Sequence, residues 1–204
     1  MNPEKRELIA FLVESEAVQF GEFTLKSGDK SPFFVDLGRV RTGRGLEFVG
    51  RQIARAVKER FPDATLLFGP AYKGIALATA AAVGFFREQG RDLAVCYDRK
   101  EGKAHGEKGL FIGQHPRPQD RVVIIDDVLS SGGTKLEAAK ALEEAFGVRP
   151  VGVIVTVDRT RKGCAYDHAA LPVQALADIH DLADYLTEKD DPRATLVRRF
   201  WEGG

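Results

Sequence analysis

The chain has 204 residues, of which 44% are hydrophobic and 29% are charged, and its 30 basic and 30 acidic residues cancel to a formal net charge of zero. We expect a single globular domain, and the balanced charge gives no reason to expect binding to nucleic acid or to an anionic membrane surface. No apolar stretch approaches the ~20 residues of a membrane span, and neither a signal peptide, a disulfide framework nor a CxxC zinc motif is present, so we expect a cytoplasmic protein.

The N-terminal residues predict one helix followed by two short strands. Asn2 and Pro3 are typical of a helix N-cap and first helical position, and apolar residues follow at helical spacing. Short apolar runs at 22–25 and 33–35 flank a turn-rich stretch at 27–30. This pattern is typical of a β-hairpin, and we expect it to cover another part of the molecule.

From residue 45 onward, apolar runs of strand length alternate with stretches of helical periodicity. The expected strands are 65–68, 93–97, 121–125, 151–157 and 174–179, and the expected helices are 45–61, 74–89, 134–146, 180–188 and 193–201. Such alternation indicates an α/β fold with a central, mostly parallel sheet flanked by helices. We expect one domain over residues 1–204.

Residues 121–135, RVVIIDDVLSSGGTK, carry the strongest functional pattern. A β-branched apolar run stops at Asp126 and Asp127, and small residues then precede a helix. Ligands of open α/β sheets bind beyond the carboxyl ends of such strands. The Ser/Gly run can offer backbone N–H groups to a phosphate at a helix N-terminus, and the carboxylates can accept hydrogen bonds from sugar hydroxyls. The segment therefore predicts a ribose-phosphate site.

Basic residues in other segments suggest a polyanionic ligand. Lys73 follows a strand in FGPAYKG, at a loop-to-helix junction that favours an anion. Arg159 follows strand 151–157, and its planar guanidinium suits a ligand carboxylate. Residues 99–109, RKEGKAHGEKG, combine basic side chains with glycines and almost no apolar surface, so they are either a solvated connector or a mobile loop that closes over a polyanion.

Several other patterns have a simpler structural reading. GPAYKGIA lacks the Lys-Ser/Thr of a P-loop, and TGRGLEFVG lacks the third glycine of a dinucleotide fingerprint. Cys96 is expected in the core, and Phe33 and Phe34 fit either the core or a stacking wall for a planar base. The histidines His115, His168 and His180 are expected at the surface or at helix caps. Trp201 is expected to anchor the terminal helix.

VVIIDDVLSSGGTK resembles the phosphoribosyl diphosphate (PRPP) signature of type I phosphoribosyltransferases. FTLKSGDKSPFFVD, FGPAYKGIALA, YDRKEGKAHGEKG and VTVDR follow in the order of the orotate branch of that family, from about residue 23 to residue 159. The signature is shared by purine and pyrimidine enzymes and by some regulators, whereas the basic loop RKEGKAHGEKG together with FTLKSG is far more specific to the orotate branch. The resemblance implies the type I fold, with a small hood formed by residues 1–40 and the C-terminal segment.

The resemblance implies transfer of ribose 5-phosphate from PRPP to N1 of orotate, which gives orotidine 5′-monophosphate and pyrophosphate in UMP biosynthesis. The implied catalytic residues are Lys103, Asp126 and Asp127. The implied PRPP-binding residues are Lys26, Tyr72, Lys73, Arg99, Lys100, Lys103, His105, Asp126, Asp127, Val128, Leu129, Ser130, Ser131, Gly132, Gly133 and Thr134. The implied orotate-binding residues are Lys26, Phe34, Val35, Ser130 and Arg159.

The resemblance also implies Mg²⁺ as cofactor, held mainly by the diphosphate and ribose hydroxyls of PRPP rather than by protein ligands. It further implies a homodimer in which the loop at about 99–110 closes over the partner's active site. Val35 stands where the family pattern suggests a second aromatic residue, so its backbone rather than a ring is expected to serve orotate. Two alternatives remain at this point: a phosphoribosyltransferase for another base, and a non-catalytic PRPP-sensing regulator.

Overall fold

A six-stranded sheet forms the centre of the computed structural model, which describes residues 1–25, 28–100, 110–163 and 166–203. The strand order is β5-β4-β3-β6-β7-β8. The strands are β3 (Leu66–Gly69), β4 (Ala94–Asp98), β5 (Phe111–Gly113), β6 (Val122–Leu129), β7 (Gly152–Asp158) and β8 (Val173–Asp178). All neighbouring pairs are parallel except β4 and β5. The expected α/β class with a mostly parallel sheet is therefore confirmed.

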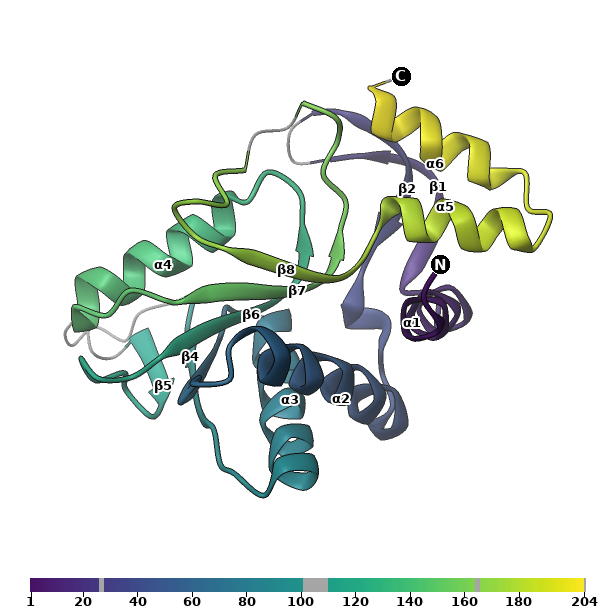
Figure 1. The fold of residues 1–204 in the computed structure, drawn as a ribbon. Helices are drawn as coiled ribbons and strands as arrows, with labels where there is room; N and C mark the ends of the chain where they lie inside the picture. The colour runs from purple at the N-terminus through teal and green to yellow at the C-terminus, as the bar shows by residue number, and fades with distance from the viewer. Residues whose placement is uncertain (26–27, 101–109, 164–165, 204) are drawn as a thin grey trace.

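Helices cover both faces of this sheet (Figure 1). On one face lie α2 (Gly43–Arg60) and α3 (Lys73–Gln89), and on the other lies α4 (Gly133–Phe146). Strand β6 is buried on both sides because alternate residues enter different cores: Val123 and Ile125 pack with the first pair of helices, and Ile124 packs with α4. A continuous apolar run is what a strand buried on both faces requires.

The terminal segments pack together as a small hood beside the sheet (Figure 1). Its elements are α1 (Pro3–Glu14), β1 (Val18–Thr24), β2 (Lys30–Val35), α5 (Ile179–Glu188) and α6 (Arg193–Glu202), with a 3₁₀ turn η1 (Leu37–Arg39) after β2. Strands β1 and β2 form the expected antiparallel hairpin, and α6 packs against β2. Phe33 and Phe200 join these two elements with ring centroids 5.2 Å apart.

Two features of the sheet differ from the sequence-based expectation. Strand β5 was not expected, since three residues beside a glycine-rich stretch give no readable period. Strand β6 does not stop at Ile125; it continues through the acid pair to Leu129, because backbone pairing with β7 extends to Leu129 opposite Asp158. Asp126 and Asp127 therefore lie within the strand, near its carboxyl end, and not in the loop after it.

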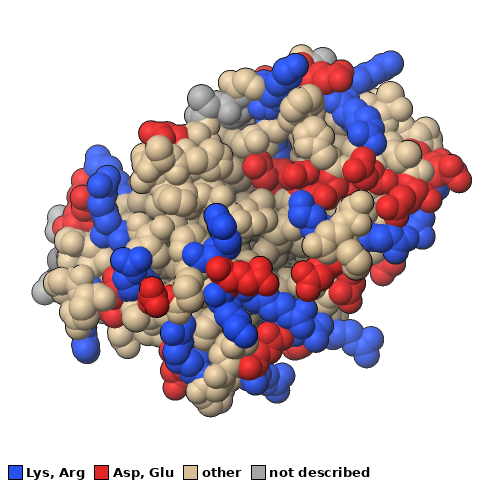
Figure 2. Space-filling model, in the orientation of Figure 1, with Lys and Arg blue, Asp and Glu red and all other residues tan. Residues whose placement is uncertain are grey.

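Basic and acidic side chains are interspersed over the face of the molecule shown in Figure 2, as the balanced composition suggests. Among the described helices, none combines the length and the apolar character needed to cross a bilayer. Cys96 is fully buried in β4, and this burial raises the pKa of its thiol to about 12. The prediction of a core cysteine is confirmed.

Candidate active site

The two acids at the end of β6 point to opposite sides of the sheet, and each meets its own lysine. Asp126 Oδ2 lies 2.6 Å from Lys135 Nζ, which comes from α4. Asp127 Oδ2 lies 2.7 Å from Lys73 Nζ, which comes from the start of α3. Alternation of side chains along a strand accounts for the division. The carboxyl end of β6 is therefore a site of two ion pairs.

Lys73 also contacts a third carboxylate, Asp36, at 3.0 Å. Burial alone would lower the pKa of Lys73, but hydrogen bonds and charge from Asp127 and Asp36 raise it above its usual value. Burial likewise opposes ionisation of Asp36, yet the hydrogen bond and charge of Lys73 hold its pKa below the usual range. Burial and the charge of Asp126 raise the pKa of Asp127, against the opposing charge of Lys73.

A tight loop between β3 and α3 positions Lys73. A Cβ at Gly69 would lie 2.3 Å from the carbonyl oxygen of Gly74, so only glycine permits the loop to close on itself. The N–H of Ala71 donates to Asp98 Oδ1 at 2.6 Å, which ties the loop to the end of β4. Tyr72 is 66% exposed at the loop surface. These contacts fix Lys73 while leaving a face of the loop open.

The small residues after β6 form a turn that leads directly into α4. Gly132 has φ +79°, and a Cβ there would lie 2.0 Å from the Tyr166 ring, so this position requires glycine. The described residues supply no side-chain cap to the N-terminus of α4, and the first N–H groups of a helix have no partner within it. Ser130, Ser131, Gly133 and Thr134 are exposed around this end. The turn has the arrangement of a phosphate-binding loop.

Arg159 follows β7 and lies 5% exposed beneath the hood. Its guanidinium is 5.3 Å from the ring centroid of Phe33 and 5.4 Å from that of Phe200. Its Nη2 is 3.3 Å from the Ser31 hydroxyl, and its Nε has no partner among the described residues. Burial lowers its pKa to about 10. A buried cation that no described carboxylate neutralises is a strong candidate for binding an anionic ligand.

The adjoining strand β2 separates two phenylalanines that the sequence could not distinguish. Phe33 is fully buried and belongs to the core. Phe34 faces the other way, is partly exposed, and stacks on Phe23 with centroids 5.6 Å apart. Only Phe34 therefore remains available as a wall for a planar base. Val35, beside it, is buried, so its side chain belongs to the core.

The remaining predicted site residues divide into three groups. Tyr72 and Lys100 lie together, with the Lys100 ammonium 5.0 Å from the Tyr72 ring centroid, and the N–H of Arg99 donates to Leu110 O at 2.7 Å. Leu129 is fully buried and Val128 partly so, which means that they can serve a ligand only through their backbone. Three predicted residues lie outside the described part of the chain: Lys26, Lys103 and His105.

Residue-by-residue reading of the sequence missed Asp36, Asp98 and Lys135. Asp36 ends the apolar run of β2 and Asp98 ends β4, so a rule that selects acids at strand ends would have found both. A lysine in the first turn of a helix is ordinarily solvated, so the burial of Lys135 has no local signal. The histidines have ring neighbours but remain exposed, as expected: His115, His168 and His180.

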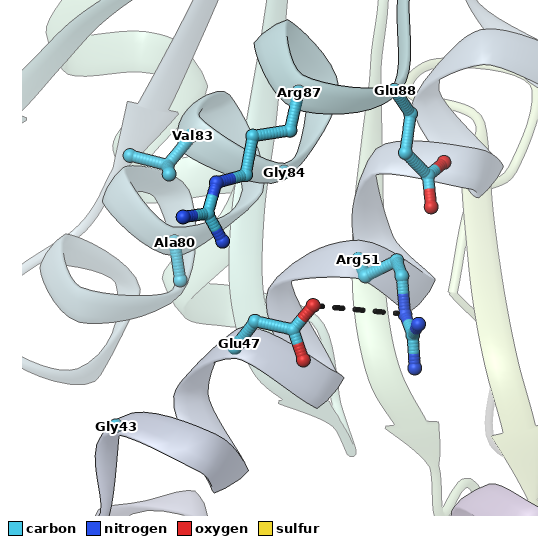
Figure 3. Close-up of a pocket in the computed structure, with 8 residues that line it drawn as sticks. All are labelled: Gly43, Glu47, Arg51, Ala80, Val83, Gly84, Arg87 and Glu88. Carbon is cyan, nitrogen blue, oxygen red and sulfur yellow. Dashed lines mark ion pairs between the residues drawn. The ribbon is translucent and has the colours of Figure 1, made fainter.

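A shallow groove of about 250 Å³ lies between α2 and α3, away from the acid pair (Figure 3). Val83 and Ala80 of α3 form its apolar part, and the Arg87 side chain runs back along α3 beside them. Glu47 and Arg51 of α2 form a loose ion pair at 3.9 Å on its other side. The phosphate loop and Arg159 are not part of this groove. The end of β6 therefore remains the candidate site, separate from this groove.

Comparison with known proteins agrees with this geometry. The phosphoribosyl transferase domain family matches residues 45–180. An orotate phosphoribosyltransferase of Salmonella arizonae is 38% identical, over 99% of this chain and 98% of that protein. The solved orotate phosphoribosyltransferase of Francisella tularensis superposes with a TM-score of 0.77 and 27% identity, covering 95% and 96% of the two chains. Leishmania donovani UMP synthase superposes with a TM-score of 0.81 and 30% identity, over 98% of this chain and 42% of that one.

Proposed function

The chain belongs to the orotate phosphoribosyltransferases of the phosphoribosyltransferase family, and on this premise we propose that it transfers ribose 5-phosphate from PRPP to N1 of orotate, with Mg²⁺ as cofactor. The products are orotidine 5′-monophosphate and pyrophosphate, and the reaction serves UMP synthesis in the cytoplasm. The whole chain, residues 1–204, acts as one phosphoribosyltransferase domain with its terminal hood.

One observation carries the proposal: a paired acid site, and a buried cation that no described carboxylate neutralises, lie at the ends of adjacent parallel strands. Asp127 at the end of β6 is 2.7 Å from Lys73. Arg159, just after β7, is buried, and its N–H donates to the carbonyl oxygen of Leu129 on β6 at 2.9 Å. A ligand with a sugar phosphate at one end and a carboxylate at the other fits such a site.

In this proposal PRPP occupies the carboxyl edge of β6. Asp126 and Asp127 accept hydrogen bonds from the ribose hydroxyls, and the turn 130–134 donates backbone N–H groups to the 5′-phosphate. Val128 and Leu129 contribute only backbone groups. The diphosphate is held by a set of basic residues with Tyr72 beside them: Lys26, Lys73, Arg99, Lys100, Lys103 and His105.

Orotate lies between the hood and the end of β7. The guanidinium of Arg159 faces its carboxylate, because a planar fork of donors matches a carboxylate in a bidentate manner. The partly exposed ring of Phe34 covers one face of the base. The Ser130 hydroxyl, the backbone of Val35 and Lys26 complete the contacts in this proposal.

We assign Mg²⁺ to the substrate rather than to a protein ligand set. Each carboxylate of the acid pair already faces a lysine, at 2.6 and 2.7 Å. Among the described residues, no three acidic, histidine or cysteine side chains gather as a cation site. Held by the substrate in this way, the ion would neutralise negative charge on the leaving pyrophosphate.

The residues of the chain act on charge that develops as the glycosidic bond breaks. Pyrophosphate gains negative charge and the ribose becomes oxocarbenium-like, so a cation on the leaving side and a carboxylate on the ribose side interact more strongly as the reaction proceeds. Orotate is anionic and needs no strong base. We assign the leaving-group role to Lys103. Lys103→Ala is expected to lower kcat by about 10²–10³-fold with PRPP affinity nearly unchanged; an unaltered kcat would remove this role.

We further propose a homodimer that docks through the exposed face of α3. Val83 and Phe86 are 54% and 51% exposed there, and Ala76 lies on the same face. The face continues to Tyr72 at the active-site loop, so a second copy bound to it can reach the site. The groove between α2 and α3 is flanked by two acidic and two basic side chains: Glu47, Glu88, Arg51 and Arg87 (Figure 3). Equal numbers of both signs suit contact between two identical surfaces.

Phe86→Glu tests this assembly, because a charge at an apolar contact opposes association. We expect the variant to elute as a monomer in size-exclusion chromatography with light scattering, and to lose most of its turnover. Leu196→Glu is the matched control: Leu196 is 46% exposed but lies on α6. A Phe86→Glu variant that keeps both mass and turnover would contradict the proposed surface.

Incubation of the purified protein with PRPP, Mg²⁺ and one base at a time tests the reaction itself. Release of pyrophosphate with orotate, and not with uracil or hypoxanthine, is the expected result. Release with hypoxanthine would instead identify a purine enzyme. PRPP binding without release in any mixture would identify a regulator.

A further inference from the structure

Lys135 is a buried lysine that lies directly beneath the phosphate loop. It occupies the first turn of α4, yet its side chain is only 4% exposed. Its Nζ is 2.6 Å from Asp126 Oδ2, 2.5 Å from the Val128 carbonyl oxygen and 3.2 Å from the Thr134 hydroxyl. An ammonium has three donors, and all three are used inside the protein.

Elementary electrostatics disfavours a lysine in this place unless it has such partners. A cation near a helix N-terminus faces the positive end of the helix dipole, and removal of an ammonium from water is costly unless its charge is paired and its donors are satisfied. The three contacts of Lys135 meet both conditions. They also join three points that surround the loop: the first acid of the pair, the end of β6 and the first turn of α4.

The second lysine of the site differs in its accessibility. The Lys73 side chain is 38% exposed and bridges Asp36 and Asp127. It can therefore turn from Asp127 toward an arriving diphosphate. The Lys135 side chain is 4% exposed, and its ammonium is also held by Val128 O and the Thr134 hydroxyl, so it is not free to turn from Asp126 toward solvent. One carboxylate of the pair thus has an exchangeable partner and the other has a fixed one.

We propose that Lys135 is a positioning residue for phosphoribosyl transfer: its buried ammonium holds Asp126 in the orientation that accepts a ribose hydroxyl. The inference rests on the proposed function and deepens it, since Lys135 acts through Asp126 and touches no substrate. The permanent ion pair also cancels one negative charge beside the place where the anionic donor binds. Asp127 is left as the carboxylate whose charge becomes available when Lys73 moves to the diphosphate.

PRPP binding to the full chain, measured by calorimetry with Mg²⁺ and without orotate, tests this role. Lys135→Met keeps the length of the side chain and removes its charge. We expect its Kd for PRPP to rise on the order of 10- to 100-fold, and its KM for orotate to change less than about twofold in turnover assays. A residue that only stabilises the fold would not separate the two substrates in this way.

Two further variants keep the test decisive. Lys140→Met alters an exposed lysine of the same helix and should bind PRPP like the wild type. The double variant Asp126→Ala, Lys135→Met removes both buried charges, so we expect it to fold even if the single variant Lys135→Met does not. If Lys135 acts through Asp126, the double variant binds PRPP no more weakly than Asp126→Ala alone. Further weakening in the double variant, or unchanged affinity in Lys135→Met, would overturn the role. The calorimetry contains no acceptor base, so it tests Lys135 independently of the reaction. If the wild type binds PRPP but does not use orotate in the turnover assay, that result counts against the proposed reaction and not against the role of Lys135.

Discussion

The end of β6 and the surroundings of Arg159 differ in whether their charged side chains have ion-pair partners. At the end of β6 every described charge of the acid site has a partner: Asp126 has Lys135, and Asp127 and Asp36 share Lys73. At Arg159 a buried guanidinium has, among the described side chains, one long hydrogen bond to Ser31 and the faces of two aromatic rings. The first region has three carboxylates and two ammonium groups, so its charges are all paired and its formal charge is −1 before any ligand arrives. The second carries an excess positive charge among the described residues.

This difference indicates how two anionic substrates can be handled by one site. The donor region must release PRPP products, so ligand groups exchange there with existing ion pairs and gain little net charge interaction. The acceptor region gains the full pairing of a buried cation with a carboxylate, which favours an anionic base over a neutral one. We therefore expect Arg159 to determine which base is accepted, and the acid pair to determine how the ribose is oriented.

The largest expected effect concerns the buried ion pair of the donor region. Asp126→Ala leaves the buried ammonium of Lys135 without a carboxylate, and breaking a buried pair in this way costs about 3–5 kcal/mol of unfolding free energy. Urea denaturation measures the loss. Asp127→Ala is the matched control, because Lys73 keeps Asp36; its loss should stay below about 1 kcal/mol. Equal losses of unfolding free energy in Asp126→Ala and Asp127→Ala would contradict the idea that the buried Asp126–Lys135 pair contributes more to stability than the more exposed Asp127–Lys73 pair.

Arg159→Met tests the unpaired side of the comparison. Since the guanidinium is expected to pair with the carboxylate of orotate, kcat/KM for orotate should fall about 10²-fold or more, while PRPP affinity stays the same. The melting temperature should not fall, because an unneutralised buried cation is removed. Steady-state kinetics and thermal denaturation give the two readouts. Arg198→Met, on an exposed arginine of α6, should alter neither.

Lys73→Met tests whether the exchangeable lysine matters for the donor. We expect KM for PRPP to rise about 10-fold, because the variant loses a cation that can meet the diphosphate. KM for orotate should remain within about twofold. If KM rises equally for both substrates, the donor and acceptor regions are not separate in the way proposed. Initial rates at varied PRPP and saturating orotate supply the measurement.

The smallest effect is a pH dependence of stability that comes from Asp36. Its folded-state pKa lies below the usual value of 3.8, because Lys73 outweighs the burial that opposes ionisation. A lowered folded pKa contributes stability that is present above pH 3.8 and disappears as the pH falls through the folded pKa. Asp36→Asn should therefore unfold at lower urea than the wild type near pH 7, and the two should converge below pH 3.8. A difference that persists in acid would point to lost packing instead.

Much of this site could be read from local patterns. The apolar run before Asp126, the Ser/Gly turn and the helix that follows are adjacent in sequence, so strand, ligand edge and phosphate loop could be predicted together. The tight loop before Lys73 and the position of Arg159 after a strand were read in the same way. In each case the relevant period or turn residue lies within about ten residues of the functional group.

What local patterns could not reveal was the partner of each charge. Asp36, the residue after strand β2 of the hood, meets Lys73, and Lys135 meets Asp126 across the turn it follows. Both contacts therefore depend on how separate elements pack. The extension of β6 past the acids depends on pairing with β7. Three predicted residues, Lys26, Lys103 and His105, lie outside the described chain, and their roles stay predictions.

The sequence by itself determined the alternation of strands and helices, and it predicted the edge at which a ligand is expected and the residue types that suit a ribose phosphate. These follow from side-chain period and turn chemistry, which act between near neighbours in the chain. Only the tertiary structure decided that Phe33 is core while Phe34 is partly exposed, and that Lys135 is buried and paired. It also decided that Arg159 is buried with no carboxylate partner in the described part of the chain. Burial and ion pairing depend on distances through space, and folding sets these by packing segments that are far apart in sequence.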